Sequence, residues 1–288
     1  HPYRSRLKYL RFLIAALLIL VLITVGKIYH DTYSIEVLHY RIENSRLADA
    51  LTGKKVAFLS DLHLKEIGSR EREVLSILKN EKPDYVFLGG DYISFRGNYE
   101  PVFDFLSDMQ RTYAVLGNTD YSNENGNCLF CHEKNSRDLK KHPAPLFLRN
   151  TCLLLGHGET GVNLLGLDDP VNKKSDISTA LRGCNRSAPA VLLAHSPEIF
   201  EEAVQQGIDL VLCGHNHGGQ IFLTKYLHGR ILIDPSLRYL KGFYQKGNTR
   251  QDMLFKDRPA KGPLTAEVFL KCPALKAHSH EQEWSEYS

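Results

Sequence analysis

The chain contains 288 residues, of which 43% are hydrophobic and 24% are charged, and its formal net charge is +3. This length allows one large α/β domain with a sizeable core. The basic residues are dispersed instead of forming a stripe, so no nucleic-acid partner is expected. The six cysteines are widely scattered and do not resemble a disulfide framework.

Residues 1–32 are predicted to form a basic segment and a membrane anchor. The run Phe12–Val25 is apolar apart from Thr24, and four basic residues precede it: Arg4, Arg6, Lys8 and Arg11. The run is shorter than the ~20 residues of a clean span, but it can extend to Tyr29 if Lys27 reaches the interface. A cleaved signal peptide and a buried core helix are the alternatives. The first lacks a good cleavage site, and the basic cluster argues against the second.

The charges around this segment leave its orientation open. Basic residues ahead of an apolar run favour a cytoplasmic amino terminus, which would place the following domain outside. Five basic residues beyond the run weaken this bias: Lys27, Arg41, Arg46, Lys54 and Lys55.

The next part of the chain is predicted to alternate strands with helices. Tyr33–Ile42 has the alternation of an edge strand, expected to pack next to the strand that ends at Asp61. Buried parallel strands are predicted at Lys54–Ser60, Asp84–Gly90 and Thr112–Gly117. Amphipathic helices are predicted at Arg70–Lys79 and Tyr99–Met109. The βαβαβ order indicates a largely parallel sheet.

Residues 120–145 interrupt this alternation. The segment is polar, and a connection of this length inside a compact domain is typically functional or disordered. Cys128 and Cys131, with His132, provide only half of a zinc site. A disulfide or two free thiols is therefore the favoured interpretation of this pair.

The second half is predicted to supply further strands and one clear helix. The predicted strands are Leu146–Leu155, Val162–Leu167, Ala190–Ala194, Asp209–Cys213 and Arg230–Ile233, and the first two are expected to meet at a turn over Gly156–Gly158. Ile199–Gln206 is the predicted helix, with Gly207 ending it. Beyond Gly247 only Leu264–Leu270 resembles a strand, and the tail 273–288 is expected to be disordered.

Polar groups follow five of the predicted strands directly. They are Asp61 and His63, then Asp91, then Asn118 to Asp120, then His195, and finally His215 and His217. The carboxyl ends of parallel strands meet at one edge of a sheet, which is where open α/β sheets bind ligands. Carboxylate and amide oxygens mixed with imidazoles suit Mn, Fe or Zn. An isolated His-x-His could equally be an exposed loop, but five such strand ends argue for a shared site.

These blocks, D-x-H, G-G-D, G-N-x-D, a single H and G-H-x-H, resemble in order those of the calcineurin-like metallophosphoesterase superfamily. The resemblance extends from about Lys54 to about Gly247. It implies an α/β fold, an αββα sandwich of two mixed sheets, here preceded by the membrane helix. The catalytic domain would span 33–272, with the 120–145 insertion near the site.

The resemblance also implies a site for two divalent metal ions, with manganese favoured. One ion would be held by Asp61, His63, Asp91 and His217, and the second by Asp91, Asn118, His195 and His215. Asp91 would bridge them, and Asp91, Asn118, Asp120 and His195 would be the catalytic set. Asp120 would orient a ligand from behind, although a helix-cap or turn role is also open.

One position departs from the family pattern. The family commonly has histidine where this chain has Thr119, whose hydroxyl cannot act as an acid near neutral pH. A pyrophosphate fits this loss, because a phosphate leaves without much protonation.

The sequence therefore predicts a hydrolase of a phosphodiester or pyrophosphate bond in a lipid-linked substrate. UDP-2,3-diacylglucosamine of lipid A synthesis is the specific prediction, at the bacterial inner membrane, with the membrane or a lipid-linked nucleotide as partner. The alternatives are a broad-specificity membrane-tethered phosphodiesterase of the cell envelope and an inactive metal-stabilised scaffold. The oligomeric state is not defined by the sequence.

Overall fold

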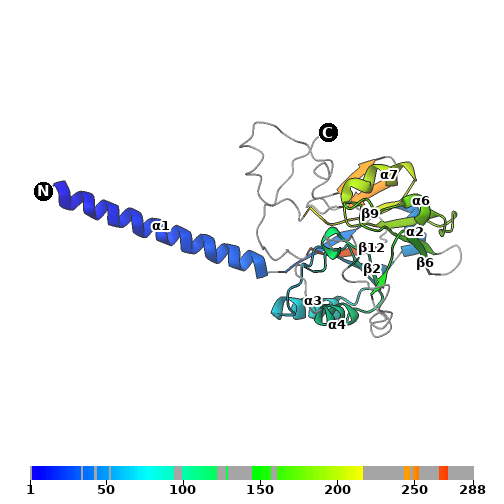
Figure 1. The fold of residues 1–288 in the computed structure, drawn as a ribbon, viewed down its shortest axis with the longest axis horizontal. Helices are drawn as coiled ribbons and strands as arrows, with labels where there is room; N and C mark the ends of the chain where they lie inside the picture. Colours follow the sequence, from blue (N-terminus) through cyan, green and yellow to red (C-terminus); the bar gives the residue numbers. More distant parts are fainter. Residues whose placement is uncertain are drawn as a thin grey trace.

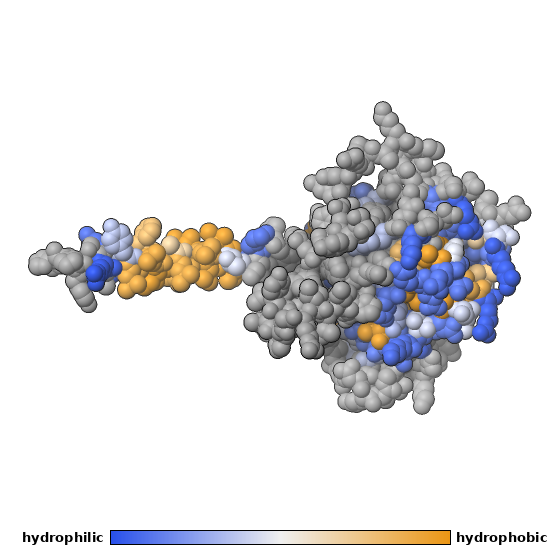
Figure 2. All heavy atoms as spheres, turned by 90° about the horizontal axis from the view of Figure 1, so that it is seen from above, coloured by the Kyte–Doolittle hydropathy of each residue, from blue (hydrophilic) through white to orange (hydrophobic). Residues whose placement is uncertain are grey.

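The computed structural model describes residues 2–33, 35–41, 44–51, 53–93, 99–121, 128, 145–156, 161–216, 243–246, 249–252 and 266–271. Helix α1 (Pro2–Tyr33) leads away from the rest of the molecule (Figure 1). Its segment Lys8–Lys27 is long and apolar enough to cross a membrane, and none of it is buried. Twenty residues of helix span about 30 Å, the thickness of the hydrocarbon layer. Figure 2 shows this apolar band between hydrophilic ends.

The first sheet has six strands in the order β1-β12-β2-β3-β4-β5. They are β1 (Glu36–Arg41), β12 (Ala266–Lys271), β2 (Lys54–Leu59), β3 (Tyr85–Leu88), β4 (Thr112–Ala114) and β5 (Leu146–Phe147). Strand β1 is antiparallel to β12, and every other pair is parallel. The predicted parallel βαβαβ unit is confirmed.

The second sheet also has six strands, in the order β10-β11-β9-β8-β7-β6. They are β10 (Phe243–Lys246), β11 (Thr249–Asp252), β9 (Leu210–Leu212), β8 (Ala190–Leu193), β7 (Val162–Gly166) and β6 (Thr151–Leu155). The central pairs are parallel, whereas the outermost pair on each side is antiparallel. Both sheets are therefore mixed, as predicted.

Helices cover the outer face of each sheet, which gives four layers (Figure 1). Helices α3 (Ser69–Glu81) and α4 (Glu100–Ser107) pack on the first sheet, and α6 (Ile177–Leu181) and α7 (Phe200–Gln205) pack on the second. The short helix α2 (Ser45–Leu51) was not predicted and joins the core between the sheets. The αββα sandwich is confirmed.

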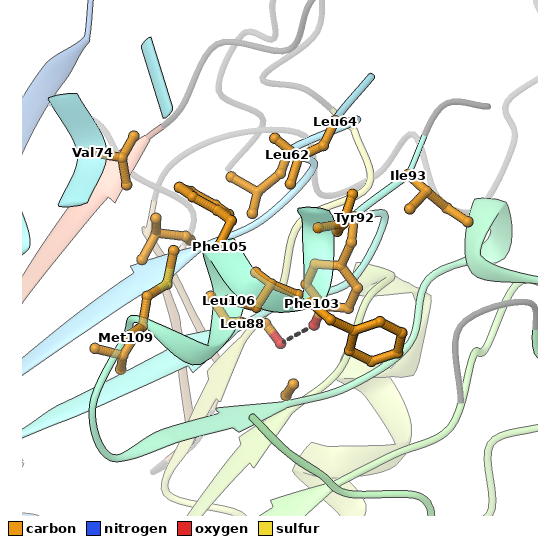
Figure 3. Packing of buried hydrophobic residues seen from close by; sticks show 14 of the residues in the cluster. Leu62, Leu64, Val74, Leu88, Tyr92, Ile93, Phe103, Phe105, Leu106 and Met109 are labelled. Carbon is orange, nitrogen blue, oxygen red and sulfur yellow. Dashed lines mark hydrogen bonds between the residues drawn. The ribbon is translucent and has the colours of Figure 1, made fainter. Parts of the chain in front are cut away.

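Three apolar clusters fill the spaces between these layers. Figure 3 shows the cluster between the first sheet and its covering helices, where Phe103, Phe105 and Leu106 of α4 pack against Leu88 of β3 and the loop residue Leu62. A buried aromatic or leucine side chain contributes about 1.5–3 kcal/mol through burial. This cluster therefore packs against the loop that follows β2 and stabilises it through Leu62.

Three predictions about the strands were wrong. Strand β1 does not pair with β2, because β12 from the end of the chain lies between them. The predicted strand 146–155 is two strands in different sheets, separated by a turn at Asn150, whose φ is +52°. Beyond Gly247 the fold continues with β11 and β12, although β11 (Thr-Arg-Gln-Asp) has no apolar pattern to reveal it. The predicted strand 230–233, the turn residues 157 and 158 and the tail 273–288 lie outside the described residues.

The cysteines also differ from the prediction. Cys152 of β6 and Cys184, which follows α6, form a disulfide between residues 32 positions apart. Cys128 is disulfide-bonded as well, but its partner lies outside the described residues, so the interpretation of the Cys128 and Cys131 motif stays a prediction. Pairing depends on which segments the fold brings together, and the scattered spacing gave no sign of it. Closing a loop of this length stabilises a fold by about 4 kcal/mol in the chain-entropy model.

Candidate metal centre

The predicted site residues come together where the carboxyl edges of the two sheets meet. The loops after β2 and β3 run side by side, since the Asp61 amide donates to the Gly90 carbonyl (3.0 Å) and the His63 amide to the Asp91 carbonyl (2.9 Å). The second sheet faces them with His195, two residues after β8, and His215, three residues after β9. The Gly214 amide donates to the His195 carbonyl (2.9 Å) and links these two loops.

One group of potential ligands surrounds the Nε2 atom of His195. This atom lies 3.1 Å from Asn118 Oδ1, 3.1 Å from His215 Nδ1 and 3.4 Å from Asp91 Oδ1. The other ring nitrogen, Nδ1, lies 2.8 Å from the Gly89 carbonyl, which holds the ring in place. A proton on Nδ1 leaves Nε2 as the ligand atom, the usual arrangement for a metal-binding histidine.

A second group consists of Asp61, His63 and Asp91, whose ligand atoms lie within 4.8 Å of one another. His63 Nε2 is 3.6 Å from Asp91 Oδ2, the oxygen that does not face His195. The amide of His215 donates to both oxygens of Asp61, at 3.1 and 3.0 Å, so the two groups are tied together. Asp91 belongs to both groups, one oxygen to each, which is the position of a bridging ligand. His217, predicted to complete this group, lies outside the described residues.

Four of these residues have strained backbones. Asp61, His63, Asp91 and His215 all have positive φ, between 43° and 73°. Residues other than glycine rarely adopt this region, and such strain costs about 1–3 kcal/mol per residue. Strain gathered on four candidate ligand residues indicates that the fold holds them for a function.

Two glycines are required by the close packing of this edge. A Cβ on Gly117 would lie 2.2 Å from Asp91 Oδ1, and one on Gly214 would lie 1.9 Å from Ser60 Oγ and 2.4 Å from Asp61 Oδ2. Any side chain at either position would therefore displace a carboxylate of the site.

Asp120 lies behind the site and is fully buried. Its carboxylate accepts three backbone hydrogen bonds, from the amides of Asp91 and Gly117 on one oxygen and from Tyr92 on the other, each 2.9 Å long. It thereby fixes the turn that carries Asp91. Burial, with the Asp91 carboxylate adding to it, raises the pKa of Asp120. The carboxylate of Asp120 thus bonds backbone amides, which agrees with a positioning role.

Opposite charges within the ligand groups attract each other. Although burial opposes both shifts, the mutual attraction of His195 and Asp91 lowers the pKa of Asp91 and raises the pKa of His195. A cation that binds at His195 Nε2 must displace any proton from it, because metal ligands bind deprotonated.

Two observations indicate that these residues suit a divalent cation. Their donors are carboxylate and amide oxygens and imidazole nitrogens, the set that suits Mn, Fe or Zn. In addition, the buried hydroxyls without a hydrogen-bond partner in the described part of the chain belong to Ser60, Thr119 and Ser196. Each of these is the sequence neighbour of a ligand residue. Unsatisfied buried groups are rare in native proteins and often mark functional sites.

Sequence reasoning missed a buried ion pair that supports the first ligand loop. Arg70 and Glu71 of α3 are 3% and 4% exposed, with Arg70 Nη2 2.8 Å from Glu71 Oε1. The same Nη2 donates to the carbonyl of Leu62, the residue between Asp61 and His63 (3.2 Å). Adjacent charges at the start of an amphipathic helix look like a solvated face, so the sequence held no signal for this contact.

The fold and this arrangement define a class: an αββα sandwich with two groups of potential metal ligands that share one aspartate. The chain belongs to the calcineurin-like phosphoesterase family, whose model matches residues 54–219. The family expected from the sequence motifs is thus confirmed.

Curated relatives carry the same domain. The chain is 28% identical over 227 residues to a zebrafish "Transmembrane protein with metallophosphoesterase domain", covering 73% of this chain and 50% of that protein. It is 28% identical to the metallophosphoesterase YkoQ of Bacillus subtilis, covering 62% of this chain and 68% of the relative. A metallophosphoesterase of Aquifex aeolicus is also 28% identical, with 71% of this chain and 78% of the relative covered. The chain thus spans only half the length of the zebrafish protein.

Among solved structures, the chain is similar to the protein TT1561 of Thermus thermophilus. The TM-score is 0.44 at 12% sequence identity, over 69% of this chain and 88% of that one.

Proposed function

We propose that the protein hydrolyses a phosphodiester or diphosphate bond with the help of two divalent cations. The observation that carries this proposal is the sharing of Asp91 between two groups of ligand atoms, each within 4.8 Å. Asp61, His63 and Asp91, with His217, would hold one cation, and Asp91, Asn118, His195 and His215 would hold the second. Manganese is our first choice for both.

Two cations in such a site supply Lewis acidity, activate water and stabilise the charge on the attacking and leaving oxygens. The residues of the chain contribute the rest. Asp91 would be the ligand that both cations share, and Asp120 and the Arg70–Glu71 pair hold the loops that carry the potential ligands. The backbone amide of Thr119 donates to Asp91 Oδ1 (2.9 Å) and so helps to orient this carboxylate.

The helix α1 supports a membrane-anchored enzyme with a lipid-linked or envelope-linked substrate. Anchoring raises the encounter rate only with substrates in the same surface. The zebrafish relative is itself named a transmembrane protein, as is a cattle relative that is 28% identical over 224 residues. In a bacterial cell, the inner membrane is the site that we propose.

The disulfides favour the external side of this membrane for the catalytic domain. The Cys152–Cys184 bond and the bonded state of Cys128 are typical of oxidising compartments and rare in the cytosol. The basic residues ahead of the apolar run, within the first turns of α1, also favour an external catalytic domain. Of the two predicted substrate classes, these observations favour an envelope phosphodiester or diphosphate over the cytoplasmic UDP-2,3-diacylglucosamine.

The enzymatic proposal is tested with the full chain in non-ionic detergent, supplied with MnCl₂ and bis-p-nitrophenyl phosphate. We expect turnover that Asp91→Asn lowers about a hundredfold or more, since it weakens both cation positions. Asp108→Asn is the matched control, because it makes the same chemical change at an exposed position at the end of α4. Binding of two manganese ions without any turnover would instead support the inactive scaffold.

The substrate and the side of the membrane need separate measurements. Release of UMP from UDP-2,3-diacylglucosamine, lost in Asp91→Asn, would support the lipid A substrate. Labelling of Cys152 with a membrane-impermeant maleimide in intact cells after reduction would support the external side. Labelling only after lysis would contradict that placement.

A further inference from the structure

A second polar cluster lies beside the metal centre and is not explained by metal binding. Its centre is Tyr121, the residue that directly follows the Asn118–Asp120 motif. The Tyr121 hydroxyl donates a hydrogen bond to the Asp168 carboxylate. Arg149 Nε donates to the other oxygen of Asp168 at 2.9 Å. The ammonium of Lys174 lies over the Tyr121 ring, 4.7 Å from its centroid. Two positively charged side chains, those of Arg149 and Lys174, thus contact the bonded Tyr121–Asp168 pair.

The strand topology places this cluster at the same edge as the metal ligands. Strand β5 runs parallel to β4, and the Leu148 amide donates to the Ala114 carbonyl, so Arg149 leaves the first sheet in the same direction as Asn118. Strand β7 runs parallel to β8, and the Leu167 amide donates to the Leu193 carbonyl. Asp168 and Asp169 therefore leave the second sheet beside His195. Burial raises the pKa of Asp169 and His195 opposes this shift, as expected for neighbours.

Hydrogen bonds fix the backbone that carries both cations. The side chain of Asn150 accepts from the Asp168 amide (3.0 Å) and donates to the Lys174 carbonyl (2.9 Å). The Lys174 amide donates to the Asp169 carbonyl at 2.9 Å. The turn at Asn150 that separates β5 from β6 thus orients Arg149 on one side and Lys174 on the other. The two positive groups are held in place before any ligand binds.

The cluster remains open to solvent at its charged end. The Asp168 side chain is 7% exposed, whereas that of Arg149 is 32% exposed. The Lys174 side chain is half-buried, and no ion pair to it is present among the described residues. A planar guanidinium and a compact ammonium at one rim are the groups that proteins use to bind phosphate.

We propose that Arg149 and Lys174 form a subsite for a second phosphate of the substrate, adjacent to the one that reacts, so that the enzyme prefers diphosphates to simple diesters. This inference rests on the proposed function, because it concerns the substrate of the same reaction. Hydrolysis breaks one P–O bond of the diphosphate, and water gives its hydroxyl to one phosphoryl group and its proton to the other product. Thr119 agrees with this class, because a phosphate leaving group requires no side-chain acid.

The test compares two substrates on the full chain loaded with manganese. Bis-p-nitrophenyl phosphate carries one phosphate, and UDP-N-acetylglucosamine carries a diphosphate. We expect Arg149→Met and Lys174→Met each to lower the ratio of kcat/KM for the diphosphate over the diester about tenfold, mainly through KM, as the loss of one charged hydrogen bond predicts. Arg149→Lys should recover part of the ratio.

Matched controls remove the same charges at exposed positions outside the cluster. Lys173→Met and Arg186→Met should leave the ratio unchanged. An unchanged ratio in Arg149→Met and Lys174→Met would refute the subsite. If kcat/KM fell equally for both substrates, the role of the cluster would be purely structural, and if it fell for neither, the cluster would have no role in the reaction.

Direct binding separates this inference from the proposed function. Calorimetry with the manganese-loaded chain should show inorganic pyrophosphate binding at least about tenfold more tightly than inorganic phosphate, with the difference lost in Lys174→Met. This measurement requires no turnover, so it tests the subsite even if no substrate is hydrolysed. If diesters are hydrolysed but the two anions bind equally, the subsite fails and the phosphoesterase stands.

Discussion

The buried carboxylate of Asp120 allows a graded prediction of stability. It is the acceptor for three buried amides, those of Asp91, Tyr92 and Gly117. A buried donor left without a partner costs about 1–3 kcal/mol. Asp120→Ala removes both acceptor oxygens and leaves all three amides without a partner, so the free energy of unfolding should fall by about 3 kcal/mol or more. This is a large part of the 5–15 kcal/mol typical of a domain.

Asp120→Asn should cost much less. One amide oxygen can still accept from Asp91 and Gly117, and only the Tyr92 amide would then face a donor. The neutral side chain also removes the repulsion with the Asp91 carboxylate that helps to raise the pKa of Asp120. We therefore expect a loss of about 1 kcal/mol, roughly a third of the loss in Asp120→Ala.

The assay is urea unfolding of the full chain in detergent, followed by circular dichroism, with Asp108→Ala and Asp108→Asn as exposed controls. Unfolding midpoints should fall in the order control, Asn variant, Ala variant, with unchanged slopes. Equal losses for the Asn and Ala variants would refute the argument, because the number of orphaned amides would then not set the cost.

Three further predictions follow from the same structure. Gly117→Ala should lower turnover about a hundredfold, since its Cβ would lie 2.2 Å from the Asp91 carboxylate, whereas Gly183→Ala, with no atom nearer than 3.6 Å, should retain activity; equal turnover would contradict the packing. Arg70→Met should cost about 3–5 kcal/mol in urea unfolding, because it leaves Glu71 buried and unpaired, and adding Glu71→Gln should recover much of this loss. Manganese at a hundred times its dissociation constant should add about 2.7 kcal/mol, a rise in Tm of roughly 5–10 °C that a chelator reverses; an unchanged Tm would argue against the metal site.

Much of the fold was predictable because short-range patterns carry it. The apolar runs before Asp61, Asp91 and His195 became β2, β3 and β8, each within a residue or two of the predicted ends. Polar β11 escaped prediction, since its strand conformation comes from pairing with β9 and β10 and not from its own composition. Strand β12 was recognised as a strand, but its place between β1 and β2 was not.

The sequence by itself determined which chemical groups follow each strand, and hence the ligand types that reach the sheet edge. This is local information, set by strand length and by the residue that comes after it. Only the tertiary structure decided that Arg70 supports the loop at Leu62 and that Arg149 and Lys174 lie on either side of the bonded Tyr121–Asp168 pair. These contacts join segments far apart in the chain, and their partners depend on how the two sheets pack, which no stretch of sequence encodes alone.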